Sequence, residues 1–185
     1  LVEEMLDFLI DFFINLTKRA LSDVDVDWYN WFEDFAYKTG PLISPEIFKK
    51  FLLPRYRKIN DYLKKYNVNV ISIDSDGNIE ALLPLLIEAG FNQICPVEQA
   101  AGMNTVNIRK KYGKSLAMLG GIDKREIAKG KKEIEQELIR QVPYLLETGG
   151  YIPTIDHSIP PDISYENFMW YLEVKKRILC GKYGC

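Results

Sequence analysis

The sequence has little of several features that identify common protein classes. It contains one histidine and three cysteines in 185 residues, with no Cys-x-x-Cys pair and no Gly-x-Gly-x-x-Gly loop after an apolar run. Because Cys95, Cys180 and Cys185 are an odd number at irregular spacing, they favour a reducing cytoplasmic location over a disulfide framework. The missing glycine-rich loop makes a nucleotide-binding sheet the poorer of the parallel α/β folds for this chain.

A cluster of basic residues is also missing. The formal net charge is -2 at pH 7, and lysines and arginines alternate with acidic residues along the chain. This pattern argues against a nucleic-acid groove. No linker rich in serine, glycine or proline divides the chain, so we expect one domain over residues 1–185.

A long uninterrupted apolar run is absent as well. Residues 1–21 are very apolar, but acidic residues interrupt them and no basic segment precedes them, so they predict neither a membrane span nor a signal peptide. They predict an amphipathic helix whose apolar stripe is broader than one neighbouring helix would cover. Such a stripe needs a partner surface.

Short apolar runs that end in acidic residues are what the sequence does contain. Val70, Ile71 and Ile73 form a β-branched run typical of a strand buried on both faces, and it ends at Asp74-Ser75-Asp76-Gly77-Asn78. Three more runs end in the same way, at Glu98, at Asp123 and at Asp156-His157. In parallel α/β folds the carboxyl ends of strands are where ligands bind.

The order of these runs predicts a helix followed by five strand-then-helix units. The expected strands lie near residues 24–28, 69–73, 93–97, 116–119 and 151–155. Helices are expected between them, with a break near Leu53 caused by Pro54 and another at Gly130. Parallel strands that alternate with helices indicate the α/β class.

Five stretches taken together resemble the uroporphyrinogen decarboxylase superfamily, whose (β/α)₈ barrels include the haem-pathway decarboxylase and the corrinoid-dependent methyltransferases. The stretches occur in the order GPLISPEIF, DSDGN, VEQAAGM, LGGIDKR and GGYIPTIDHSIPPDIS. The resemblance implies a TIM barrel of this type, of which the chain would hold the C-terminal part, about five of the eight strands. The arginine-rich substrate segment and the catalytic aspartate of the decarboxylase lie in the front half in that family, so neither role is assigned here.

The resemblance also implies a metal site. The methyltransferases of the superfamily hold zinc with a His-x-Cys-Gly motif after one strand and a cysteine after the last, and these positions correspond here to Asp74, Asp76 and His157. Two carboxylates and one imidazole suit a divalent metal, such as zinc, that polarises an oxygen, which favours a methyl ether as donor. The alternative is that Asp74 and Asp76 cap the next helix and that His157 is a hydrogen-bonded loop residue.

The expected substrate pocket combines aromatic residues of the first strand unit with acidic residues at the strand ends. Its candidate residues are Trp28, Trp31, Glu33, Asp34, Glu98 and Asp123. The resemblance then predicts a corrinoid-dependent methyltransferase, or the C-terminal part of one, with cobalamin on a partner protein. Two alternatives remain open, a fragment of uroporphyrinogen decarboxylase and a non-catalytic module that docks to a corrinoid protein. Because open strand edges are a liability, we also expect pairing with a complementary barrel half or with a second copy.

Overall fold

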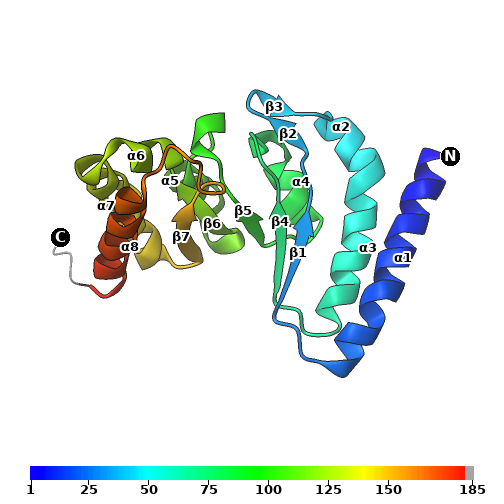
Figure 1. Ribbon diagram of the computed structural model, residues 1–185. Coiled ribbons are helices and arrows are strands. Elements are labelled where there is room, and N and C mark those ends of the chain that lie inside the picture. The colour runs from blue at the N-terminus through cyan, green and yellow to red at the C-terminus, as the bar shows by residue number, and fades with distance from the viewer. Residues whose placement is uncertain (182–185) are drawn as a thin grey trace. The chain divides into compact units, whose positions relative to one another are not determined.

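A computed structural model of the chain describes residues 1–181, so Cys185 lies outside the described residues. Five strands follow one another in the sheet order β1-β4-β5-β6-β7, and the pairs β1/β4 and β6/β7 are parallel. Figure 1 shows helices following these strands along the chain, as the sequence predicts for the α/β class. The strands are β1 (Trp28–Phe32), β4 (Val70–Asp74), β5 (Gln93–Cys95), β6 (Ala117–Ile122) and β7 (Tyr151–Ile155).

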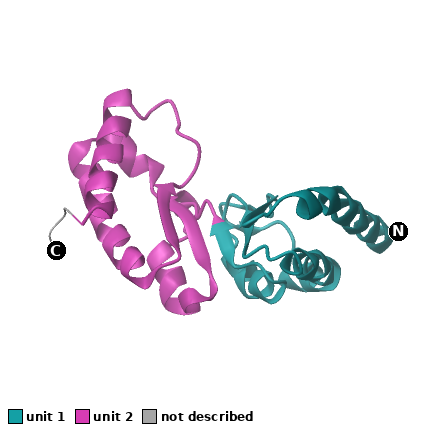
Figure 2. Cartoon of the chain, turned by 90° about the horizontal axis from the view of Figure 1, so that it is seen from below, with its two compact units in different colours: residues 1–94 teal, residues 95–185 magenta. Residues whose placement is uncertain are grey.

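The chain divides into two compact units, residues 1–94 and residues 95–185 (Figure 2). Whether they act as the single domain expected from the sequence stays a prediction. Unit 1 contains α1 (Val2–Asp23), the hairpin β2 (Ala36–Tyr37) and β3 (Gly40–Pro41), α2 (Pro45–Ile47), α3 (Leu53–Lys64) and α4 (Leu83–Glu88). Unit 2 contains α5 (Thr105–Tyr112), α6 (Lys124–Lys129), α7 (Lys131–Thr148) and α8 (Tyr165–Leu179).

The core of unit 1 is aromatic. The Tyr56 ring on α3 lies 5.5 Å from the ring of Trp31, 6.1 Å from that of Phe48 and 5.3 Å from that of Phe91. These contacts pack α3 against β1, and α1 lies on the outer side of α3 (Figure 1). The pairs with Trp31 and Phe91 are edge-to-face and the pair with Phe48 is stacked, and both arrangements add directional contacts to the burial of apolar area.

The predicted break near Leu53 is confirmed. Ser44 caps α2, its hydroxyl accepting a hydrogen bond from the Ile47 amide at 3.2 Å. A π-helical segment, Phe48–Leu52, then precedes α3, whose first turn contains Pro54. Since proline has no amide hydrogen to donate to the preceding turn, the backbone widens there instead of continuing as a regular helix.

The predicted position of the first strand was wrong. The alternation of Val24 and Val26 with aspartates suggested a strand at 24–28, but α1 continues to Asp23 and the strand is Trp28–Phe32. Val24 is exposed, whereas the Trp31 side chain is buried against α3. Packing of a large aromatic side chain on a helix, and not the alternation of small ones, decides which residues pair with β4.

The helices of unit 2 follow the sequence prediction closely. Gly130 separates α6 from α7 with a φ of +149°, a conformation that favours glycine. Ser164 caps α8, its hydroxyl accepting from the Asn167 amide at 3.2 Å. The fully buried core of this unit lies between β6 and the helices α6, α7 and α8, and includes Met118, Ile122, Ile127, Ile134, Leu138, Val142 and Val174.

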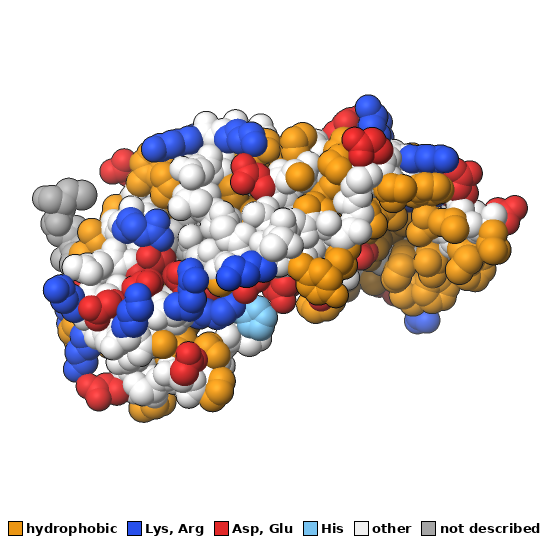
Figure 3. All heavy atoms as spheres, turned by 90° about the horizontal axis from the view of Figure 1, so that it is seen from above, with side chains coloured by type: hydrophobic (Ala, Val, Ile, Leu, Met, Phe, Trp, Pro, Cys, Tyr) orange, Lys and Arg blue, Asp and Glu red, His pale blue; other side chains and the backbone are white. Residues whose placement is uncertain are grey.

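One helix, α1, exposes many apolar side chains. Hydrophobic side chains gather on the α1 side of unit 1 in Figure 3, and several of the largest exposed ones belong to this helix. Its inner side packs on α3 through the ion pairs Asp7–Arg55 at 2.9 Å and Asp11–Lys58 at 2.6 Å. Within residues 1–181 no helix has the length and apolar character needed to cross a membrane.

Candidate functional site at the strand ends

In unit 2 the carboxyl ends of β6 and β7 are joined by one buried carboxylate. Asp156 directly follows β7 and is fully buried; its oxygens accept from the backbone amide of Gln99 at 2.8 Å and from that of Lys124 at 3.1 Å. Burial raises the pKa of Asp156, although the two amide bonds and Lys124 act in the opposite direction. Asp156 therefore ties together the segments that follow β5, β6 and β7.

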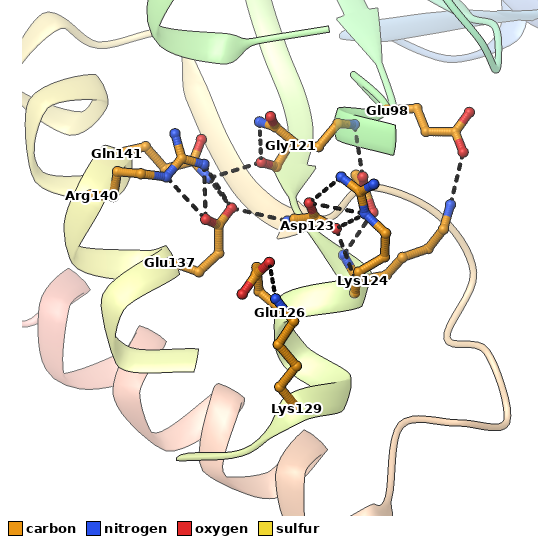
Figure 4. A network of polar contacts seen from close by, with 12 residues as sticks. Glu98, Gly121, Asp123, Lys124, Glu126, Lys129, Glu137, Arg140 and Gln141 are labelled. Atoms are coloured by element: carbon orange, nitrogen blue, oxygen red, sulfur yellow. Dashed lines mark hydrogen bonds and ion pairs between the residues drawn. The ribbon is translucent and has the colours of Figure 1, made fainter. Parts of the chain in front are cut away.

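Two ion pairs lie at the start of α6 (Figure 4), whose first amide donates to Asp156. The Lys124 amine is 2.9 Å from Glu98, and both side chains are mostly buried. Arg125 makes a two-point contact with Asp123, at 2.9 and 2.6 Å. Burial would raise the pKa of Asp123, but the bonds from Arg125 and the charge of Lys124 outweigh it, so the carboxyl has a lowered pKa. The cations that follow β6 are thus neutralised by neighbouring carboxylates.

A second buried carboxylate, on α7, contacts the carboxyl end of β6. Glu137 accepts from the Asp123 amide at 3.1 Å, from Arg140 at 2.8 Å and from the Gln141 side chain at 2.7 Å. Gln141 also donates to the Gly121 carbonyl at 2.9 Å. Burial raises the pKa of Glu137, while the Asp123 amide and Arg140 lower it. These bonds hold the end of β6 against α7.

In unit 1 a second group of polar residues follows β1 and β4. Glu33 accepts a 2.6 Å hydrogen bond from the Tyr56 hydroxyl, and Asp34 accepts from the Asp76 amide at 3.2 Å. The Ser75 hydroxyl accepts from the Phe35 amide at 3.1 Å. Burial raises the pKa of Glu33, the bond from Tyr56 lowers it, and the charge of Asp34 raises it. Glu33 is therefore a carboxyl whose proton affinity depends on one tyrosine.

We expect Tyr56→Phe to raise the pKa of Glu33 further, because the substitution removes the bond that favours the charged form. A carboxyl whose folded pKa is raised contributes most below its unfolded pKa, so the variant should lose additional stability as the pH rises above about 4 to 5. Titration of the Glu33 carboxyl carbon by NMR, with urea unfolding at two pH values, would measure both effects. The control is Tyr66→Phe, at a tyrosine of the same unit that bonds another tyrosine. An unchanged Glu33 titration in Tyr56→Phe would contradict the assignment.

The three predicted metal ligands belong to different units. Asp74 ends β4 and Asp76 follows it in unit 1, whereas His157 follows β7 in unit 2. Within residues 1–181 no group of three or more His, Cys, Asp or Glu side chains is arranged to hold a metal ion. The oxygen and imidazole donors suit a divalent cation by their chemistry, and the metal site stays a prediction. Just before the 3₁₀ turn Glu80–Leu82, the Asn78 side chain accepts a hydrogen bond from the Glu80 amide at 3.0 Å.

The predicted pocket residues take several roles. Trp28 begins β1, so it lies at the opposite end of that strand from Glu33, roughly 16 Å away at about 3.3 Å per residue. Trp31 lies in the core, and its indole N–H donates to Asn60 at 3.3 Å. Trp31 and Glu33 also line a small cavity of about 80 Å³ under α1. Asp34, Glu98 and Asp123 lie in the strand-end groups described above.

His157 lines an open hollow of about 330 Å³ in unit 2. Its walls include Ile155, Ile159 and Phe168, and Lys175 reaches it from α8. The Lys175 amine lies 4.9 Å from the centre of the Tyr171 ring, and burial lowers its pKa. The hollow therefore combines an imidazole and an amine with apolar walls, a composition typical of small-molecule sites.

Sequence reasoning missed Asp156, Lys124 and Lys175 as site residues. Asp156 stands directly before the selected His157 and ends an apolar run, so its position was a usable signal. Its bonds to residues 32 and 57 positions away were not visible locally. Lys175 lies inside α8, where its neighbours in sequence predict an ordinary surface residue.

Parallel strands followed by helices, with polar groups at the carboxyl ends of the strands, are typical of part of an α/β barrel. The model of the uroporphyrinogen decarboxylase (URO-D) family matches residues 1–178, and the chain belongs to this family. The predicted family and fold class are thus confirmed.

Two relatives show how much of such proteins the chain covers. A uroporphyrinogen decarboxylase from Geobacter metallireducens is 24% identical over 147 residues, which are 75% of this chain and 39% of that protein. A solved methyltransferase from Methanosarcina mazei shares the fold, with a TM-score of 0.56 and 20% identity over 83% of this chain and 42% of that chain. The chain thus spans less than half the length of either relative.

Proposed function

We propose that this chain acts in methyl transfer from a methylated substrate, such as a methyl ether, to cobalamin carried by a partner protein, as a member of the uroporphyrinogen decarboxylase family. Decarboxylation of uroporphyrinogen is the alternative, and a non-catalytic role in docking to a corrinoid protein is the second. The chain's own residues supply the argument for methyl transfer, since the relatives carry names from both activities.

The observation that carries the proposal is the sign of the charge at the strand ends. Every strand of the sheet is followed, directly or after a short loop, by at least one carboxylate: Glu33 and Asp34, Asp74 and Asp76, Glu98, Asp123, and Asp156. Lys124 and Arg125, the cations directly after β6, are paired with Glu98 and Asp123. A tetrapyrrole that carries many carboxylates would find both of these cations already paired, which opposes its binding. A neutral ether does not need an unpaired cation.

The residues of the chain have distinct tasks in this proposal. The family resemblance assigns a divalent metal to Asp74, Asp76 and His157, and such a metal would supply a Lewis acid for an ether oxygen. Asp156 holds the backbone of Gln99 and Lys124, so that the loops around the site keep their positions. The hollow beside His157 offers apolar walls to the body of the donor, and the Lys175 amine offers a hydrogen bond to its oxygen.

The purified chain, mixed with reduced free cobalamin and a panel of methyl ethers, is expected to methylate the cobalt, which visible absorbance follows directly. His157→Ala should abolish this reaction. It should also weaken zinc binding, measured by calorimetry, by more than about 100-fold, since loss of an outer-shell partner alone costs about 10–100-fold. Asp162→Asn, at an exposed acid of the same loop, is the matched control and should change neither measurement.

The alternatives make different predictions for the same preparations. If uroporphyrinogen loses carboxyl groups and cobalamin is not methylated, the chain acts as a decarboxylase and the methyl-transfer proposal is wrong. If neither reaction occurs but the chain still binds a corrinoid protein, the non-catalytic docking role is supported. Methyl transfer that is unchanged in His157→Ala would remove the role proposed for that residue.

A further inference from the structure

A cavity of about 80 Å³ lies under α1 in unit 1. Its walls come from α1, β1, the π-helical segment and α3. They bring together three aromatic rings, one carboxylate and one guanidinium, which belong to Phe13, Trp31, Tyr56, Glu33 and Arg55. The cavity is several times larger than the roughly 10–15 Å³ that one water molecule needs. It therefore has room for a small ligand, and the chemistry of its lining indicates which kind.

The cavity is on the helix-facing side of the sheet. Trp31 and Glu33 are two residues apart, so their side chains point to the same face of β1. On that face the Trp31 ring packs on Tyr56 of α3, and the Tyr56 hydroxyl donates to Glu33 at 2.6 Å. Phe32 points to the opposite face and is 78% exposed. The cavity is thus separate from the face on which Phe32 lies, and it shares no lining residue with the hollow beside His157.

Glu33 gives the cavity an excess of negative charge. Its partner, the Tyr56 hydroxyl, is a neutral donor. Arg55 is the cation of the lining, but Asp7 accepts two bonds from its guanidinium, at 2.9 and 3.1 Å. A carboxylate has about four lone-pair positions, and a charge that is mostly removed from water needs a compensating charge or several hydrogen bonds. Glu33 therefore has capacity for a cation that the lining residues do not supply.

The aromatic rings favour a cation over a neutral ligand. The rings of Phe13 and Trp31 lie 5.5 Å apart, and so do those of Trp31 and Tyr56. Both pairs are nearly perpendicular, with angles of 79° and 80°, so the three rings line the cavity in different orientations. The face of an aromatic ring attracts a cation, and a carboxylate adds a full counter-charge. An ammonium group uses both, because its N–H bonds go to the carboxylate while the rings stabilise its charge.

From the carboxylate, the occupied guanidinium and the three rings, we propose that this cavity binds a compact ammonium cation, either ammonium itself or methylammonium. Glu33 supplies the counter-charge and accepts the N–H hydrogen bonds, and the rings of Phe13 and Trp31 contact the remainder of the ligand. The volume excludes a bulky cation such as tetraethylammonium. This inference is independent of the proposed methyl transfer and requires neither a metal nor cobalamin.

Titration with ammonium chloride or methylammonium chloride, followed by the indole N–H signals in NMR spectra, tests the binding. The signal of Trp31, whose ring lines the cavity, should shift and reach saturation. Because the ligand has so few atoms, saturation is expected in the millimolar range. The signal of Trp170, in α8 of unit 2, is the internal control and should not shift. Sodium chloride and tetraethylammonium chloride at the same concentrations should leave both signals unchanged.

Variants of the lining test the position of the ligand. Glu33→Gln keeps the size of the side chain and removes its charge, so it should weaken methylammonium binding by about 10-fold or more. Asp61→Asn, at an acid of α3 whose side chain is 58% exposed, is the matched control and should bind as the unaltered chain does. Leu6→Phe leaves Glu33 in place and fills part of the cavity from α1, so it should also prevent binding. Circular dichroism shows which variants are folded, and Leu6→Phe decides the result if Glu33→Gln does not fold.

Three results would contradict the ammonium site. If neither cation gives a saturable shift of the Trp31 signal, the proposal is wrong. An equal shift with sodium chloride would show an effect of ionic strength and would overturn the proposal as well. Binding of unchanged strength in folded Glu33→Gln, or in folded Leu6→Phe, would place the ligand outside this cavity.

Discussion

The substitution Gly120→Ala is expected to lower the free energy of unfolding by more than about 4 kcal/mol, or to prevent folding altogether. Gly120 lies in β6 with a φ of +113°, and a Cβ atom added there would overlap the carbonyl group of Pro96. That carbonyl also accepts a 2.9 Å hydrogen bond from the Gly121 amide, so it has no free space into which to move. Backbone strain and steric overlap therefore act together at one buried position.

Urea unfolding followed by circular dichroism would measure this loss. Gly149→Ala is the matched control, because Gly149 has a φ of +73° but no atom within 4 Å of an added Cβ. It should cost about 1 to 3 kcal/mol, because an L-residue would be held in a backbone region that glycine alone adopts readily. Equal losses for the two variants would show that steric overlap contributes nothing, and would contradict the close approach of β6 to Pro96.

Asp156→Ala is expected to lower the free energy of unfolding by about 3 kcal/mol, because two buried amides lose a charged acceptor and hydrogen bonds to charged groups are worth about 1.5–3 kcal/mol each. The amides belong to Gln99 and Lys124, on segments after two different strands. Loss of the carboxylate should therefore increase the local opening of both segments. Hydrogen exchange at these two amides, compared with the unfolding free energy, is the direct measurement.

Asp156→Asn separates charge from hydrogen bonding. The amide side chain keeps one acceptor oxygen but turns an NH₂ group toward the other amide, so about half of the loss should remain. Because burial raises the pKa of Asp156, the folded state holds the proton more tightly than the unfolded state. The stability that this group contributes is then greatest below the unfolded pKa of about 3.9 and declines as the pH rises through the folded pKa. The difference in unfolding free energy between the unaltered chain and Asp156→Asn should therefore become smaller as the pH rises over that range. A difference that grows with pH would contradict the raised pKa.

Many elements of the fold could be predicted because their signals are local. The β-branched run ending at Asp74 placed a strand at 69–73, and the structure has it at Val70–Asp74. Gly130 predicted a break in the helical region after β6, and the structure has it there, between α6 and α7. Helix caps, proline breaks and buried strands depend on neighbours a few residues away, so the sequence contains the information needed to locate them. The family resemblance rested on motifs in those same segments.

The first strand and the contacts at the strand ends could not be predicted in this way. Whether Val24 or Trp31 is buried depends on where α3 packs, and α3 begins more than 20 residues after Trp31. The order of residues in the chain likewise predicted a row of carboxylates at the strand ends but not their partners. Asp156 became a buried link between two loops, whereas Asp123 became the partner of Arg125.

By itself the sequence determined the type and order of the elements, the carboxylates that follow each strand, and the family to which the chain belongs. Only the tertiary structure decided which of these carboxylates are buried and paired, and which side of the broad apolar stripe of α1 packs on α3. The physical reason is that hydrophobic periodicity and helix capping act over a few residues, whereas burial and charge pairing depend on groups that folding brings together from distant parts of the chain.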